Sequence, residues 1–168
     1  MIRVFVVTIS DGVAAATRED RSGAALVKRA EELAWAVVGS RVVADEIQHI
    51  AALLIELADG GTVDVILTTG GTGLGPRDVT PEAAKAIAHR DVPGFGEMMR
   101  AEGRAKTKFA SLSRGGAVTR GSVLILNLPG SPRGALESLM TVADLVPHTV
   151  DLLHGRTEHK DDSPKLRR

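Results

Sequence analysis

A glycine-rich stretch from Thr68 to Pro81 is the segment whose residue types and spacing are best suited to chemistry. It reads TTGGTGLGPRDVTP and comes directly after an apolar run at 63–68. Glycines let the backbone approach a ligand closely and aim its amide groups at an anion. Asp78 adds a carboxylate of the kind that Mg²⁺ prefers. The stretch therefore predicts a phosphate-binding loop, and a purely structural glycine turn is the alternative.

Two familiar phosphate-binding patterns do not fit this loop. A P-loop would need Gly-Lys-Ser/Thr where Gly75, Pro76 and Arg77 stand. The dinucleotide fingerprint needs its third glycine three residues after its second, whereas Gly71, Gly73 and Gly75 are each separated by one residue. That fingerprint also follows the first strand of its unit, and this loop follows the third apolar run. The loop thus indicates a different class of phosphate binder.

Asp45 is a second carboxylate that could serve the same site. It follows the second predicted strand, and Asp78 follows the third. Ligands of open α/β sheets bind outside the carboxyl ends of the strands, so both side chains can reach one crevice. Taken alone, Asp45 is also typical of a helix N-cap. Asp78 alone is equally typical of a turn, and both interpretations stay open at this point.

The elements that must position these residues alternate along the chain. Helices are expected to begin after Ser22 as N-cap and at Thr80 as N-cap, with Pro81 in the first turn. The alternation predicts an α/β fold: a three-layer sandwich with a mostly parallel sheet, helices on both faces and a small β-hairpin addition near 113–126. Strands are predicted at 2–9, 36–44, 63–68 and 123–127, and helices at 23–35, 46–58, from 80, 95–104 and 133–153.

Length and composition narrow the class of protein. The chain has 168 residues, which suits one domain, expected at 1–155 with a charged, disordered tail at 156–168. Cysteine is absent, which excludes disulfides and thiolate chemistry. The formal net charge is zero and only 2% of the residues are aromatic, which argues against a nucleic-acid binder. No apolar run reaches the length of a membrane span, so a cytoplasmic protein is expected.

Four motifs in order resemble one family. The glycine loop continues as TTGGTGLGPRDVTPEA, and LNLPGSP stands at 126–132. Ser10 and Asp11 are followed by EDRSG at 19–23, and SLSR stands at 111–114. Together they resemble the molybdenum-cofactor proteins of the Mog/MoaB type, which also supply the N-terminal domain of gephyrin. The resemblance covers about residues 2–155.

The resemblance implies a molybdopterin adenylyltransferase, an enzyme that transfers AMP from Mg-ATP to the terminal phosphate of molybdopterin and releases pyrophosphate. It implies Asp45 and Asp78 as catalytic residues and Mg²⁺ ligands. It further implies a homotrimer, ATP as co-substrate without a tightly bound organic cofactor, a molybdenum-insertion protein as downstream partner, and no nucleic-acid or membrane partner. The substrate- and nucleotide-binding residues by resemblance are Ser10, Asp11, Asp20, Ser22, Gly23, Thr69, Gly70, Gly71, Thr72, Gly73, Thr80, Pro81, Ser113, Arg114, Asn127, Pro129, Gly130 and Ser131.

Two other functions compete with this one. A MoaB-type protein could bind and deliver molybdopterin without turnover, and the fold alone also allows an unrelated nucleotide- or sugar-phosphate-binding protein. The strings at 77–81 and 127–130 look closer to the Mog branch. The carboxylate pair favours the enzyme, because a pure binder needs no metal-holding groups near the phosphates.

Overall fold

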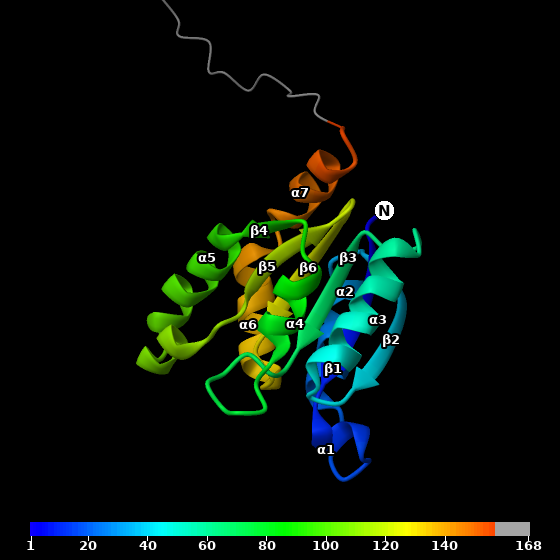
Figure 1. Ribbon diagram of the computed structural model, residues 1–168. Coiled ribbons are helices and arrows are strands. Elements are labelled where there is room, and N and C mark those ends of the chain that lie inside the picture. Colours follow the sequence, from blue (N-terminus) through cyan, green and yellow to red (C-terminus); the bar gives the residue numbers. More distant parts are fainter. Residues whose placement is uncertain (157–168) are drawn as a thin grey trace, which may run out of the picture.

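The computed structural model describes residues 1–156, so the predicted tail at 156–168 lies almost wholly outside the described residues. Its centre is one six-stranded sheet in the order β2-β1-β3-β6-β5-β4 (Figure 1). The strands are β1 Arg3–Ile9, β2 Ala36–Val43, β3 Val65–Thr69, β4 Arg90–Val92, β5 Gly116–Arg120 and β6 Val123–Leu128.

Four neighbouring strands are parallel, which confirms the predicted sheet. β1 pairs in parallel with both β2 and β3, and β3 pairs in parallel with β6. β5 and β6 pair antiparallel and form the expected hairpin, with Gly121 in the turn between them at a φ of +55°. The short edge strand β4 pairs antiparallel with β5 and was not predicted, because three residues are too few to show a period.

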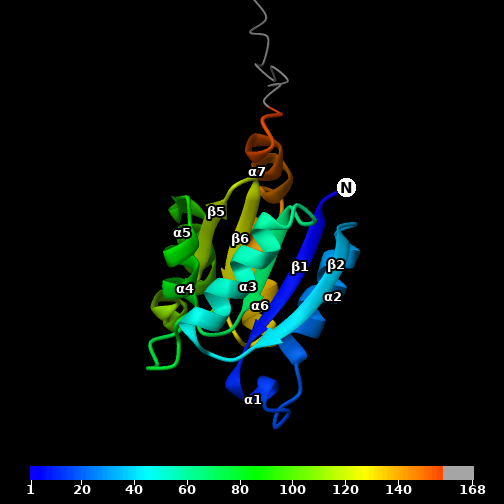
Figure 2. The ribbon, with the colours of Figure 1, turned by 45° about the vertical axis from the view of Figure 1, so that its right-hand side comes forward.

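Helices cover both faces of the sheet, as Figures 1 and 2 show. Helices α2, α5, α6 and α7 pack on one face, and α3 and α4 on the other. The alternation of side chains explains the split: Val65 and Leu67 face the first group, and Ile66 between them faces the second. The helices are α1 Asp11–Ala14, α2 Arg21–Glu32, α3 Ile47–Asp59, α4 Thr80–Ile87, α5 Pro93–Arg104, α6 Pro132–Val142 and α7 Val146–Leu153, with a 3₁₀ helix η1 at Lys108–Leu112.

Two predicted helix caps are wrong. The N-cap of α2 is Asp20, whose Oδ1 accepts from the amide of Gly23 at 2.8 Å, and Ser22 lies buried inside the first turn. The N-cap of α4 is Val79, and Thr80 is already helical. The hydroxyl of Thr80 instead donates to the carbonyl of Gly70 at 2.8 Å. Serine and threonine are both common N-cap residues, so the local sequence allowed either assignment and tertiary contacts determined which residue became the cap.

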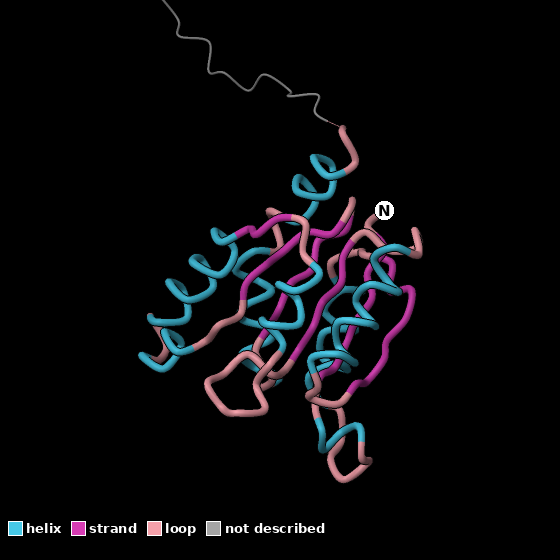
Figure 3. The backbone as a smooth tube through the Cα atoms, in the orientation of Figure 1, coloured by secondary structure: helices cyan, strands magenta, loops and turns pink. Residues whose placement is uncertain are grey.

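The loops that follow β1, β2, β3 and β6 gather at one end of the sheet, at the lower side of Figure 3. The long loop there is the glycine-rich stretch, which runs from Thr69 to Thr80. Among the described residues, no helix is both long and apolar enough to cross a membrane. The fold thus places the predicted chemistry at the carboxyl ends of the parallel strands.

Candidate active site

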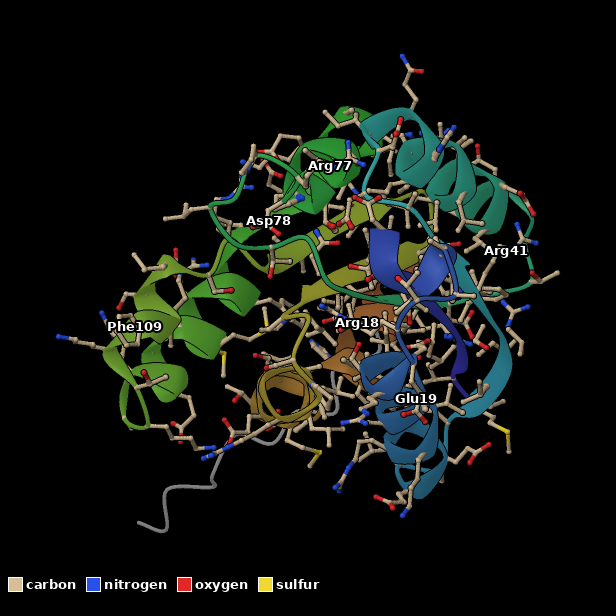
Figure 4. The ribbon with its side chains drawn as sticks, turned by 90° about the horizontal axis from the view of Figure 1, so that it is seen from below. Arg18, Glu19, Arg41, Arg77, Asp78 and Phe109 are labelled. Carbon is tan, nitrogen blue, oxygen red and sulfur yellow. The ribbon has the colours of Figure 1, made fainter. Side chains whose placement is uncertain are left out.

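A polar cavity of about 640 Å³ lies at this end of the sheet. The ends of β1 and β3, the loop after β2 and the first turns of α2 and α6 surround it. Figure 4 looks onto this end, with Arg77 and Asp78 on the glycine loop, Arg18 near the centre and Glu19 at the start of α2. Its lining residues include Ser10, Arg18, Asp20, Ser22, Asp45, Thr69, Gly70, Gly71, Asp78, Gly130 and Ser131.

Asp45 and Asp78 both line this cavity, and each is held by one oxygen. Asp45 Oδ2 accepts from the amide of Asp11 at 2.7 Å, and Asp78 Oδ2 accepts from the amide of Gly75 at 2.7 Å. Asp45 is not the N-cap of α3, because that position is Glu46. Each carboxylate therefore keeps a second oxygen that no hydrogen bond in the described part of the chain uses.

The electrostatics of Asp45 fit a cation at this place. Burial raises the pKa of Asp45, and the negative charges of Asp11 and Asp78 raise it further. The amide of Asp11 and the charge of Arg77 act in the opposite direction without cancelling the rise. No group of three or more His, Cys, Asp or Glu side chains within residues 1–156 could hold a metal ion by itself. Mg²⁺ is commonly bound by one or two carboxylates together with phosphates and water, so this pair fits Mg²⁺ bound with a polyphosphate.

The path of the glycine loop depends on two glycines whose φ angles are positive. Gly70 has φ +107° and Gly71 has φ +63°. A Cβ at Gly70 would lie 2.1 Å from the carbonyl oxygen of Ile9, so only glycine fits beside the end of β1. Gly130 approaches from the end of β6, where its own Cβ would lie 3.2 Å from the Cα of Gly70. The ends of β1, β3 and β6 therefore lie close together, and the backbone of all three lines the cavity.

Two helix N-termini point into the same cavity. α2 begins after Asp20, which also accepts from the hydroxyl of Thr8 at 2.7 Å, and α6 begins after Ser131. Ser131 Oγ accepts from the amide of Gly134 at 3.1 Å. The N-terminus of a helix presents free amides and the positive end of the helix dipole to an anion. The arrangement is therefore suited to hold phosphate groups beside the carboxylate pair.

A second, mostly apolar cavity of about 530 Å³ adjoins the first and shares Gly130 and Ser131 with it. Its walls come from α5, η1 and α6, and Phe109 at its rim lies far from Arg18 in Figure 4. Leu74, Phe109 and Leu112 are exposed along it. A cleft whose surface is mostly apolar, with polar groups among its lining residues, is typical of a small-molecule site. The lining includes Thr72, Gly73, Leu74, Met99, Arg100, Phe109, Leu112, Ser113, Pro129, Glu137 and Ser138.

Comparison with known proteins decides the family. A family model described as a probable molybdopterin binding domain matches residues 5–148. The chain belongs to this family. The match spans every strand of the sheet except the first two residues of β1, together with all the loops that form the two cavities.

Relatives of this molybdopterin-binding domain carry names from both branches of the family. The molybdopterin adenylyltransferase of Helicobacter pylori J99 is 39% identical, over 92% of this chain and 89% of that protein. That of Escherichia coli K12 is 38% identical, over 92% and 86%. The crystal structure of the molybdopterin biosynthesis enzyme MoaB from Thermus thermophilus superposes with a TM-score of 0.87 at 45% identity, over 92% and 98%. The Mog protein of Mycobacterium ulcerans has a TM-score of 0.84 at 33% identity, over 91% and 99%.

The structure brings most of the sequence-predicted residues of this molybdopterin-binding domain to the two cavities. The polar cavity gathers ten of them, and the apolar cavity adds Thr72, Gly73, Ser113 and Pro129 to the shared Gly130 and Ser131. Six predicted residues line neither cavity: Asp11, Gly23, Thr80, Pro81, Arg114 and Asn127.

Three of these residues have partners of their own within the described structure. The carboxylate of Asp11 accepts two hydrogen bonds from the guanidinium of Arg77, both at 3.0 Å, which lowers the pKa of Asp11. Asn127 is 3% exposed, and its Oδ1 accepts from the hydroxyl of Thr68 at 2.9 Å. A Cβ at Gly23 would lie 2.3 Å from Asp20 Oδ2, so Gly23 is required by the cap of α2.

Sequence reasoning missed Arg18 and the whole outer wall of the apolar cavity. Arg18 lines the polar cavity and pairs with no carboxylate in the described part of the chain. Arg18 lies between the Ser10-Asp11 motif and the EDRSG motif at 19–23 and belongs to neither, so no motif indicates a binding role for it. The outer wall comes from α5 and η1, where Arg100 and Phe109 stand in a segment that reads as an ordinary solvated helix and turn. Only the helical spacing of Phe95 and Met99 hints at packing there.

Proposed function

We propose that the chain is a molybdopterin adenylyltransferase of molybdenum cofactor biosynthesis, which transfers AMP from Mg-ATP to the terminal phosphate of molybdopterin and releases pyrophosphate. The observation that carries the proposal is the meeting of two cavities at Gly130 and Ser131. One cavity holds a carboxylate pair and two helix N-termini, and the other is mostly apolar. The reaction joins two substrates that each carry a ring and a phosphate.

The polar cavity is assigned to the phosphates. The amides at the starts of α2 and α6 and the guanidinium of Arg18 would bind them, and Asp45 and Asp78 would hold Mg²⁺. Mg²⁺ bound there would neutralise charge on the phosphate oxygens. The apolar cavity is assigned to the ring of one substrate.

No side chain needs to act as nucleophile in this reaction. An oxygen of the molybdopterin phosphate attacks the α-phosphorus of ATP, and the bond to the bridging oxygen of pyrophosphate breaks. Positioning and charge neutralisation are the main contributions that a protein makes to such a transfer. The residues around the polar cavity supply both. Because the reaction consumes ATP, we assign it to the cytoplasm.

The alternative function is binding and delivery of molybdopterin without turnover. The carboxylate pair supports the enzyme instead. The deciding experiment is mass analysis after the protein is mixed with molybdopterin, ATP and Mg²⁺. Adenylylated molybdopterin that forms only with Mg²⁺ supports the enzyme, and bound but unmodified molybdopterin supports the delivery protein.

We further propose that the chain works as a homotrimer that passes its product to a molybdenum-insertion protein. Support comes from the family resemblance and from apolar side chains exposed on several elements of the single chain. These include Val38, Val42, Met98, Met140, Leu145 and Leu152. Flat contacts between subunits commonly use such residues.

A further inference from the structure

The short segment Ser113–Gly115 contributes to the wall of the apolar cavity only. Ser113 and Gly115 line the apolar cavity, whereas Arg114 between them lines neither cavity. The amide of Arg114 donates to the carbonyl of Thr72 at 2.8 Å, so the segment runs beside the glycine loop. The Arg114 side chain is 32% exposed and lies along that loop.

The guanidinium of Arg114 holds both ends of the loop from Gly73 to Asp78. Its Nε donates to the carbonyl of Gly73 at 2.7 Å, and its Nη2 donates to the carbonyl of Asp78 at 2.6 Å. Its Nη1 pairs with Glu82 in the first turn of α4. One planar group therefore fixes the two carbonyls that open and close this part of the loop.

A second side-chain anchor of the loop is Arg77, which donates two hydrogen bonds to the carboxylate of Asp11, and few contacts hold Asp78 itself. The amide of Asp78 donates to the carbonyl of Gly75 at 3.0 Å, and the amide of Gly75 donates to Asp78 Oδ2 at 2.7 Å. Leu74 at its tip is 67% exposed, so no apolar packing restrains it. Two glycines in the loop also raise the conformational entropy that ordering must overcome. Arg114 is thus the side chain that holds the backbone carbonyl of Asp78, whereas Arg77 ties the loop to Asp11 through its own side chain only.

We propose that Arg114 is a positioning residue, which sets the place of the Asp78 carboxylate by anchoring the glycine loop, and not a phosphate ligand. The proposal rests on the proposed function, since it gives Asp78 a task in adenylyl transfer. Arginine suits this role because its fork of N–H groups can bind two carbonyls at fixed geometry, whereas a lysine ammonium is a flexible point charge. Arg114→Lys therefore keeps the positive charge and removes the anchor.

The test compares Arg114→Lys with the unmodified protein in rate and in loop order. Pyrophosphate release should show kcat reduced by about 10–100-fold, because a misplaced group can cost about 10²-fold. The KM for molybdopterin should stay within about threefold, since no phosphate contact is lost. Hydrogen exchange of the Gly75 and Asp78 amides, measured in the protein without substrates, should be at least about tenfold faster because opening of the loop costs less.

The matched control is Glu82→Gln, which removes the ion pair of Arg114 but leaves its two bonds to the loop carbonyls. We expect this variant to change kcat by less than about fivefold, because exposed ion pairs contribute little. Circular dichroism checks that each variant is folded.

Two results would overturn the proposal. The first is unchanged exchange of the Gly75 and Asp78 amides in folded Arg114→Lys, whatever its rate. The second is a KM for molybdopterin that rises at least about tenfold with an unchanged kcat, which would make Arg114 a substrate-binding residue, as the family resemblance implies. Absent turnover in the unmodified protein would instead contradict the proposed function, and the exchange measurement would still decide the role of Arg114.

Discussion

Asp78→Asn should nearly abolish adenylyl transfer while leaving molybdopterin binding intact. Asp78 Oδ2 accepts from the amide of Gly75 at 2.7 Å. An asparagine can keep that bond only with its single carbonyl oxygen, so the other position of the carboxylate becomes an NH₂ group. An NH₂ group donates hydrogen bonds and cannot bind Mg²⁺. The change therefore removes a metal ligand without opening the loop.

The expected cost follows from that loss. Removing one group that stabilises the charge of a transition state commonly costs about 3–4 kcal/mol, or roughly 10²–10³ in kcat. The stability of the fold should change by only about 1 kcal/mol, because the loop bond is kept. Asp45→Asn should act in the same direction, since Asp45 Oδ2 is held by the amide of Asp11 in the same manner. If both groups hold one metal ion, the double variant should lose less than the sum of the two.

The assay is the rate of pyrophosphate release at saturating Mg-ATP, with molybdopterin binding measured in parallel. Asp91→Asn is the matched control, because Asp91 is an exposed carboxylate on the edge strand β4 and lines neither cavity. It should keep the rate of the unmodified protein. Turnover at the unmodified rate in Asp78→Asn would refute the metal assignment.

The remaining predictions concern stability and assembly. Hydrogen bonds from Arg3 lower the pKa of the buried Asp64 from 3.8 to about 2, a shift that contributes about 2 kcal/mol of stability above pH 5 and is lost as the pH falls toward 2. Urea unfolding should show this acid loss in the unmodified protein and much less of it in Asp64→Asn. Gly71→Val should lower the free energy of unfolding by at least about 2–3 kcal/mol, because φ is +63° and a Cβ would lie 2.3 Å from Thr80 Oγ1. Gly73→Val should keep the stability but slow turnover, because its Cβ would meet only the end of the Asp78 side chain, at 2.8 Å; equal stabilities of the two valine variants would contradict this. Light scattering at micromolar concentration should give a trimer, and a monomer would count against the proposed assembly.

The sequence by itself determined the layers of the fold and the end at which the site lies. The runs at 63–68 and 123–127 are mostly apolar, which predicts strands buried on both faces of a parallel sheet. Helical periodicity between these runs then leaves little freedom in the topology. Because a parallel sheet collects the carboxyl ends of its strands, Asp45, Asp78 and the glycine loop had to meet.

Only the tertiary structure decided which of the motif residues line a cavity. Asp20 and Ser22 are both acceptable caps in a local view, and the hydroxyl of Thr8 from β1 binds the carboxylate and makes Asp20 the cap. Arg114 meets Asp78 across 36 residues, and Arg77 meets Asp11 across 66. Periodicity reports burial and local conformation, whereas the choice of a hydrogen-bond partner depends on which segments the packed sheet brings together. The same packing brings a motif arginine, Arg114, to the carbonyls of Gly73 and Asp78 at the two ends of the loop.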